Sequence, residues 1–281
     1  MKDNKIWLIT GASQGLGLIL AKTLLQNGYR VAGSARDLPA IEVALGSKTD
    51  SFLPIVIALG DEHTIQLAVQ QTLDHFGRID VLVNNAGYGQ SGTIEELDDQ
   101  EVRNNFSVNV FGLLNVTRAV LPVMRRQNSG HIFNLSAIGG FSAGYPGLGI
   151  YAATKFAVAG LSEALSEEVK PFGIKVTIVY PGFFRTSFLS TGSLQVAKNL
   201  NPAYLPVHQA QHEMRRSMDG KQFGDPEKLA GILIAMSENP DPALHLFLGV
   251  DAMQVASDKI KSLQAELTKW KKTTISTSFD A

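Results

Sequence analysis

The loop at residues 10–17 reads Thr10-Gly11-Ala12-Ser13-Gln14-Gly15-Leu16-Gly17. It follows a short apolar run, Ile6–Thr10, and it precedes a helical pattern over residues 15–27. Glycine permits the tight turn from a strand into a helix, and it lets another group approach the backbone closely. The helix N-terminus presents unpaired N–H groups and a favourable dipole to an anion. A loop of this composition can be a plain turn, but its place directly after the first strand favours an anion-binding site.

Short, nearly continuous apolar runs alternate with longer helical patterns along the chain. Parallel strands that are buried on both faces have this near-continuous apolar character. The runs are Ile6–Thr10, Tyr29–Ser34, Phe52–Ala58, Ile79–Asn84, His131–Ser136 and Ile174–Val179, and the helical patterns lie near 15–27, 61–76, 98–126 and 149–171. The alternation predicts an α/β fold, a doubly wound parallel sheet with helices on both faces. A glycine loop after the first strand of such a fold indicates dinucleotide binding.

The alternation stops after the sixth strand. Residues 183–225 form a long connection, which we expect to be a lid or a disordered stretch. Asp225-Pro226-Glu227 then predicts a helix start, because an N-capping residue precedes a proline at the first helical position. A last strand is predicted near Leu244–Leu248, before a C-terminal helix at roughly 251–272.

The C-terminal helix carries one apolar stripe, made of Ile260, Leu263, Leu267 and Trp270. We expect this stripe to pack on the domain, and a dimer contact or a cap over the pocket are the alternatives. No break in composition divides the chain. We therefore predict one Rossmann-type domain over residues 1–250, including the substrate loop 183–225, with a helical extension at 251–281 packed on the same domain.

Composition narrows the class of protein. The chain has 281 residues, of which 44% are hydrophobic and 18% charged, and its formal net charge of −1 does not suit a nucleic-acid-binding protein. It has no cysteine, which excludes disulfides, thiolate metal ligands and cysteine nucleophiles, and we expect no metal site. We find neither a signal peptide nor an apolar run near the roughly 20 residues that span a bilayer. We therefore expect a cytoplasmic protein that does not enter a membrane.

Four motifs in a fixed order carry a resemblance to a known family. They are the glycine loop, then Asn84-Asn85-Ala86-Gly87, then Tyr151-Ala152-Ala153-Thr154-Lys155, then Pro181-Gly182 followed by Thr186. Each stands at the end of the element where the short-chain dehydrogenase/reductase family has it, and the resemblance continues to about residue 250. It implies a single Rossmann domain with strand order 3-2-1-4-5-6-7. It also implies that the chain interconverts a carbonyl compound and an alcohol with a nicotinamide cofactor.

The end of the second strand bears on the choice of cofactor. An acidic residue there binds the ribose hydroxyls of NAD, but this chain has Ala35 followed by Arg36. A guanidinium can pair with the 2′-phosphate of NADP, and the resemblance gives Ser13 the same role. We therefore predict NADP(H). The alternative is that Asp37 binds the ribose of NAD. Asp61, after the third strand, either contacts adenine or caps the next helix.

The resemblance carries the cofactor contacts over to matching positions of this chain. These are Gly11, Ser13, Gln14, Gly15, Leu16, Gly17, Arg36, Asn85, Ala86, Gly87, Tyr151, Lys155, Pro181, Gly182, Phe184 and Thr186.

Tyr151 and Lys155 are the candidate catalytic pair, four residues apart on one face of a predicted helix. A free tyrosine has a pKa near 10, and lowering it to about 7 requires roughly 4 kcal/mol of stabilisation of the phenolate. An ammonium group about 4 Å away supplies roughly that much at an effective dielectric constant near 20. The resemblance makes Tyr151 the general acid and base. It gives Asn109 the part of holding a water that links Lys155 to solvent.

The serine that completes this group in the family has no clear counterpart. Aligned from the fifth strand, its position falls on Ala137, and aligned back from Tyr151 it falls on Ile138. We predict that Ser136 serves, and Ser142 or no serine at all are the alternatives. Losing such a hydrogen-bond donor costs on the order of 10²–10³ in rate.

Apolar segments on both sides of the motifs predict the substrate pocket. Phe141, Tyr145, Phe183 and Phe188 are its candidate residues, and they favour an apolar carbonyl compound over a sugar. Two alternatives stay open, an NAD-dependent alcohol dehydrogenase of the same family and a nucleotide-sensing protein with little catalysis. The resemblance further suggests a homodimer, paired through the helices near 98–126 and 149–171.

Overall fold

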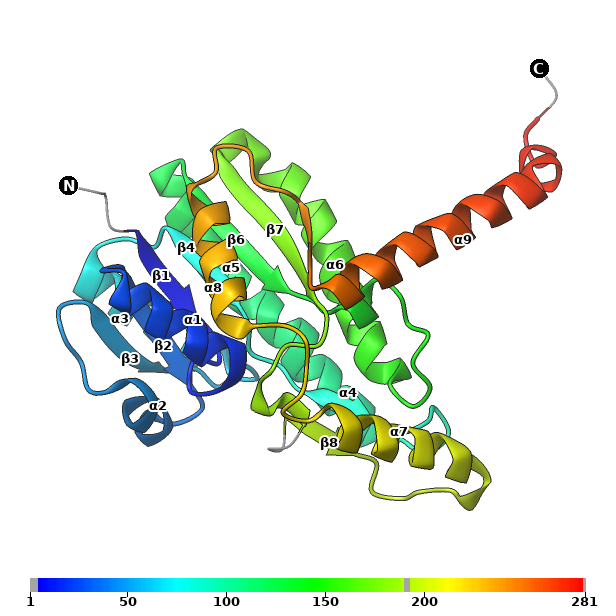
Figure 1. The fold of residues 1–281 in the computed structure, drawn as a ribbon. Helices are drawn as coiled ribbons and strands as arrows, with labels where there is room; N and C mark the ends of the chain where they lie inside the picture. The colour runs from blue at the N-terminus through cyan, green and yellow to red at the C-terminus, as the bar shows by residue number, and fades with distance from the viewer. Residues whose placement is uncertain (1–4, 190–192, 280–281) are drawn as a thin grey trace.

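A computed structural model describes residues 5–189 and 193–279 of the chain (Figure 1). Its centre is a seven-stranded sheet in the order β3-β2-β1-β4-β6-β7-β9, and every neighbouring pair is parallel. Numbered along the chain, these strands give 3-2-1-4-5-6-7, so the predicted topology is confirmed. The strands are β1 Ile6–Ile9, β2 Arg30–Ala35, β3 Phe52–Val56, β4 Val81–Asn84, β6 Gly130–Leu135, β7 Ile174–Pro181 and β9 His245–Leu248.

Helices cover both faces of the sheet. On one face, α1 (Gly15–Gln26) and α8 (Pro226–Glu238) pack with the strands around Trp7, Val81 and Phe133. On the other face, α3 (Glu62–Phe76) and α5 (Leu113–Gln127) pack around Leu8, Leu82 and Ile132. Alternate residues of one strand thus enter opposite cores, which explains why the strands are apolar without interruption.

The helix predicted over 98–126 is interrupted. It begins as α4 (Asp99–Phe106), widens into a π-helical turn at Ser107–Gly112 and continues as α5. Such turns often occur at functional sites. Asp99–Gln127 is also long and apolar enough to span a bilayer by length and composition, and this differs from the sequence expectation. Half of the most apolar 18-residue stretch of this segment is buried inside the fold, as in the core helix of a globular domain.

Part of the prediction for residues 183–225 is wrong. The described part of this connection contains a short strand, β8 (Leu194–Val196), and a helix, α7 (Leu205–Met218). β8 pairs in parallel with β5 (Gly89–Ser91), which forms a small second sheet. Residues 190–192 of this connection lie outside the described residues. The helix α2 (Leu38–Leu45) was also not predicted from the sequence.

The C-terminal helix does not pack on the domain as predicted. α9 (Val250–Ile275) is buried against it only near its start, at Ala252 and Ala256. Figure 1 shows the rest of α9 projecting away from the domain. The apolar stripe at Ile260–Trp270 is therefore exposed, since nothing within residues 5–189 and 193–279 covers it.

Candidate active site

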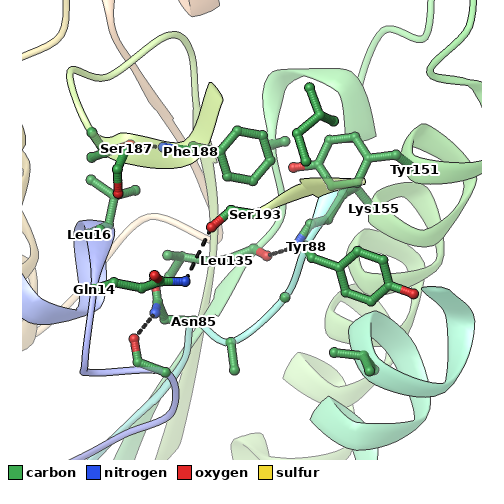
Figure 2. A pocket seen from close by; sticks show the side chains of 18 of the residues that line it. Gln14, Leu16, Asn85, Tyr88, Leu135, Tyr151, Lys155, Ser187, Phe188 and Ser193 are labelled. Atoms are coloured by element: carbon green, nitrogen blue, oxygen red, sulfur yellow. Dashed lines mark hydrogen bonds between the residues drawn. The ribbon is translucent and has the colours of Figure 1, made fainter. Parts of the chain in front are cut away.

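The motifs meet at the carboxyl edge of the parallel sheet. Residues after β1, β2, β4, β6 and β7 line one cavity of about 880 Å³, because the carboxyl ends of parallel strands share one edge. The helix α6 (Gly149–Val169) and the helix α7 form its further walls. Figure 2 shows the glycine loop, Tyr151 and Phe188 around this space.

The glycine loop leaves the N-terminus of α1 available to a ligand. Gln14 occupies the N-cap position without a side-chain capping bond, and the first turn has no acidic residue. Gly11 and Gly15 have φ of 67° and 58°, the left-handed conformation that glycine adopts readily. The Gln14 amide instead donates to the Ser193 hydroxyl at 3.2 Å (Figure 2). Free N–H groups beside open backbone fit the pyrophosphate of a dinucleotide.

Gly17 is needed inside the loop and does not line the cavity. A Cβ atom on Gly17 would lie 2.3 Å from the Gly11 carbonyl oxygen and 2.4 Å from Nδ2 of Asn85. Asn85 donates from Nδ2 to the carbonyls of Thr10 and Gly11, at 2.9 and 3.0 Å. The N–H groups of Asn85 and Ala86 donate to the Thr10 hydroxyl. The Asn-Ala-Gly segment therefore fixes the shape of the glycine loop.

The carboxylates beside the second strand are used as helix caps. The Asp37 side chain accepts a bond of 2.9 Å from the N–H of Ala40 and caps α2, although Asp37 also lines the cavity. Asp61 accepts from His63 N–H and caps α3, outside the cavity lining. Arg36 is exposed at the edge of the same cavity. Of these three charged residues, Arg36 lines the cavity without capping a helix.

Lys155 is buried, and its ammonium group is held by the end of β6. Its Nζ donates to the Leu135 carbonyl at 2.8 Å and lies 5.9 Å from the centre of the Tyr151 ring (Figure 2). Burial lowers the pKa of Lys155 to about 8. Burial also raises the pKa of the Tyr151 phenol above its ordinary value. At neutral pH the site therefore holds a protonated phenol beside an ammonium group.

These protonation states correct one expectation from the sequence. The sequence predicts that Lys155 lowers the pKa of Tyr151 from about 4 Å, whereas in the structure its ammonium group is directed to the Leu135 carbonyl. Desolvation then sets the direction of the pKa shift of both groups, because burial disfavours the charged form of each. The phenol is thus available as a proton donor and is not preformed as a phenolate.

Ser136 lies at the cavity, but its hydroxyl hydrogen is already used. The Ser136 Oγ donates to the backbone carbonyl of Lys155 at 2.9 Å. Ala137 also lines the cavity, whereas Ser142 does not. The structure therefore brings Ser136 to the predicted place and engages it in holding α6 against β6.

Asn109 lies behind the cavity wall rather than in it. From the π-helical turn, its Nδ2 donates to the Tyr88 carbonyl at 2.9 Å and to the Thr154 hydroxyl at 3.0 Å. Its Oδ1 accepts from the Tyr88 N–H at 3.0 Å. A Cβ atom on Gly87 would lie 2.9 Å from that oxygen, so only glycine fits between them. Asn109 thus joins the segment after β4 to α6.

Three of the four residues predicted for the substrate pocket line the cavity, and the fourth does not. Tyr145, Phe183 and Phe188 line the cavity, and the ring of Phe188 lies 6.1 Å from that of Tyr151. Phe141 instead packs against Tyr180 and Phe247, in an aromatic cluster outside the cavity lining. Phe141 follows a short 3₁₀ turn that directs its ring under the sheet edge.

Several lining residues were missed by sequence reasoning. Tyr88 could have been found, because it directly follows the Asn-Ala-Gly motif. Gln211, Met214 and Arg215 come from α7, which carried no motif. No signal in the sequence placed α7 over the cavity.

A buried carboxylate anchors α7. Glu96 accepts hydrogen bonds from the Thr93 and Asn201 N–H groups at 2.8 and 2.7 Å, and it contacts His208 of α7 at 2.7 Å. Burial alone would raise the pKa of Glu96, but these bonds outweigh it and hold that pKa at about 2. A charged Glu96 therefore ties α7 to the body of the domain.

Known proteins are similar to this chain in both sequence and fold. The chain matches the short chain dehydrogenase family over residues 5–195. The chain belongs to the short-chain dehydrogenase family. A family relative, the oxidoreductase BOA17 of Botryotinia fuckeliana, is 36% identical over 276 residues, 98% of this chain and 99% of the relative. A 3-ketodihydrosphingosine reductase of Bacteroides thetaiotaomicron is 40% identical over 200 residues, 71% of each chain.

A solved structure of this family extends the likeness to nearly the whole chain. The short-chain dehydrogenase of Streptomyces avermitilis is 38% identical and superposes with a TM-score of 0.88, covering 98% of this chain and 100% of that one. The protein is therefore an oxidoreductase of the short-chain dehydrogenase family.

The role of the hydrogen bond from Ser136 to the Lys155 carbonyl of α6 can be tested by substitution. Ser136→Ala should lower the free energy of unfolding by about 1 kcal/mol, because it removes a buried hydrogen bond to the Lys155 carbonyl. Urea denaturation measures this change. Ser142→Ala is the matched control, expected to change stability by less than about 0.5 kcal/mol. Equal stability of both variants would contradict the structural role of Ser136.

Proposed function

We propose that the protein is an NADP(H)-dependent reductase that interconverts an apolar ketone or aldehyde and its alcohol. One observation carries this proposal. The Tyr151 phenol lines the same cavity as the glycine loop and as Tyr145, Phe183 and Phe188. A proton donor that shares one cavity with a dinucleotide site and apolar side chains suits carbonyl reduction.

The cofactor fits the residues present at the carboxyl edge. The free N–H groups at the start of α1 would hold the pyrophosphate, and Asn85-Ala86-Gly87 with Pro181-Gly182 would line its path toward Tyr151. Thr186 and Phe184 also line this path. When bound, NADPH supplies the hydride that reduces the carbonyl carbon.

The protein's own residues then manage the proton. Tyr151 donates its phenolic proton to the oxygen that gains negative charge, which is a much stronger base than a phenolate. Lys155, protonated below about pH 8, stabilises the phenolate that this donation leaves. An ammonium group has three N–H donors, and the Leu135 carbonyl accepts from one of them, so the others can turn toward ligand and phenol.

Two observations favour NADP(H) over NAD(H). Ala35 stands at the end of β2 in the place of the acidic residue that would bind the ribose of NAD. The two nearby carboxylates, Asp37 and Asp61, cap helices, while Arg36 and Ser13 line the cavity. A guanidinium and a hydroxyl provide charge-assisted and neutral hydrogen bonds to a 2′-phosphate.

The lining of the cavity favours a large apolar substrate. Leu148, Phe188, Leu194 and Met214 line it together with Tyr151. The relative in Bacteroides thetaiotaomicron is a 3-ketodihydrosphingosine reductase. The cavity, of about 880 Å³, lies near the upper end of the roughly 300–1,000 Å³ that is typical of ligand pockets.

The general acid is tested by Tyr151→Phe. This variant keeps the ring that packs against Phe188 but lacks the proton. We expect kcat for reduction of a long-chain ketone to fall by about 10²–10⁴. NADPH affinity, measured by fluorescence titration, should change by less than about twofold, since less than 0.5 kcal/mol is at stake. Substantial turnover by this variant would refute the role of Tyr151.

The choice of cofactor is tested by Arg36→Ala. The dissociation constant of NADPH should rise by about 10–100-fold, because a charge-assisted contact to the phosphate is lost. The dissociation constant of NADH should stay within about twofold of its wild-type value. Arg126→Ala, an exposed arginine at the end of α5, is the control. Equal losses for both cofactors would contradict the assignment.

A further inference from the structure

We propose that the free part of α9 forms a two-stranded coiled coil with α9 of a second copy of this chain. The proposal concerns a surface that the cofactor and substrate sites do not use. It therefore stands or falls independently of the proposed reaction.

The free part of α9 is a helix without a partner inside its own chain. From Ile260 to Ile275 every residue is exposed, and Figure 1 shows this segment pointing away from the domain. It is about 24 Å long at 1.5 Å per residue. A single helix of this length is marginal in water, because most helical stability in proteins comes from packing of an apolar face. The segment therefore needs a surface against which to fold.

Its apolar residues have the spacing of a coiled coil. Ile260, Leu263, Leu267 and Trp270 follow one another at steps of three, four and three residues, with side chains 55%, 43%, 62% and 54% exposed. These are the a and d positions of a heptad repeat. Between Ser257 and Thr274 every other residue is polar except Ala265. Two of every seven positions are thus apolar, which gives a narrow seam. A narrow seam matches the contact between paired helices rather than a broad stripe that faces a membrane.

The charges beside the seam are complementary between two copies in parallel. Glu266 precedes the a-position Leu267, and Lys271 follows the d-position Trp270. In a parallel pair, Glu266 of one helix lies beside Lys271 of the other, the arrangement by which such flanking charges set partner and orientation. A second copy supplies this match by itself, because both charges are carried by the same helix.

The start of α9 is fixed well enough to present the seam. Asp251, in the first turn, accepts a hydrogen bond of 2.7 Å from the Phe183 N–H, and Ala252 and Ala256 are buried against Phe141 and Phe247. The body thus holds one end of the helix and directs the other outward. Holding the helix in this way reduces the entropy that pairing would otherwise cost.

Single cysteines test the pairing in the full-length protein, which has none of its own. Leu263→Cys places a thiol in the seam at a d position. Ala265→Cys places one on the opposite side of the same helix, as the matched control. Under mild oxidation we expect a disulfide-linked dimer from Leu263→Cys, formed at least about tenfold faster than from Ala265→Cys. No dimer, or equal dimer formation from both variants, would overturn the proposal.

Charge substitution in the seam gives a second readout. Leu263→Glu with Leu267→Glu should raise the dissociation constant of self-association, measured by sedimentation, on the order of tenfold or more. Ala265→Glu with Thr268→Glu adds the same charge outside the seam and should leave that constant unchanged. Equal effects of the two double variants would overturn the proposal. Binding of the wild-type protein to anionic vesicles, without cross-linking of Leu263→Cys, would do so as well.

Discussion

A pair of buried hydrogen bonds between β6 and α6 supports the whole site. Lys155 donates from its side chain to the Leu135 carbonyl, and Ser136 donates from its side chain to the Lys155 carbonyl. The two bonds run in opposite directions between the end of one strand and one residue of a helix. They fix both the depth and the rotation of α6, so Tyr151, one helical turn earlier, faces the cavity. Burial disfavours this ammonium group and lowers its pKa to about 8, and the hydrogen bond to the Leu135 carbonyl offsets part of that cost.

Other buried polar groups extend this support. Asn109 links the backbone after β4 to Thr154 of α6, and Asn134 of β6 donates to Ser162 on the same helix. Asn84 donates to Asn134 and so joins β4 to this group. Each of these residues makes at least one buried hydrogen bond, although Oδ1 of Asn84 has no partner among the described residues. The family signatures thus perform two tasks, since some residues face the cavity and others hold the walls in place.

Much of the fold could be predicted from the sequence because its signals are local. Strands with two buried faces are apolar without interruption, and a glycine loop marks where the first strand becomes a helix. The π-helical turn at Ser107–Gly112 could not be foreseen, because α4 and α5 share one periodic pattern. The place of Phe141 depends on Tyr180 and Phe247, far away in the chain. The stripe on α9 was recognised, but periodicity does not tell whether the partner is the same chain or another.

The protonation states of Tyr151 and Lys155 likewise could not be predicted from the sequence. Spacing placed Tyr151 and Lys155 on one helix face, but it could not show that the lysine would bond a strand carbonyl and leave the phenol protonated. The position of Ser136 predicts the serine of the catalytic group, whereas in the structure its hydroxyl donates to the Lys155 carbonyl of α6. The result is a site in which a protonated phenol lies beside a buried ammonium group.

The pH dependence of kcat/KM for ketone reduction with NADPH tests this account most directly. Reduction requires the protonated forms of both Tyr151 and Lys155, and the pKa of Lys155 lies near 8, below its ordinary value. The account therefore predicts a rate that is constant near neutral pH and falls as pH rises through about 8. A rate that instead climbs steadily from neutral to alkaline pH would show that reduction does not depend on the protonated forms of these two groups, and it would contradict the account.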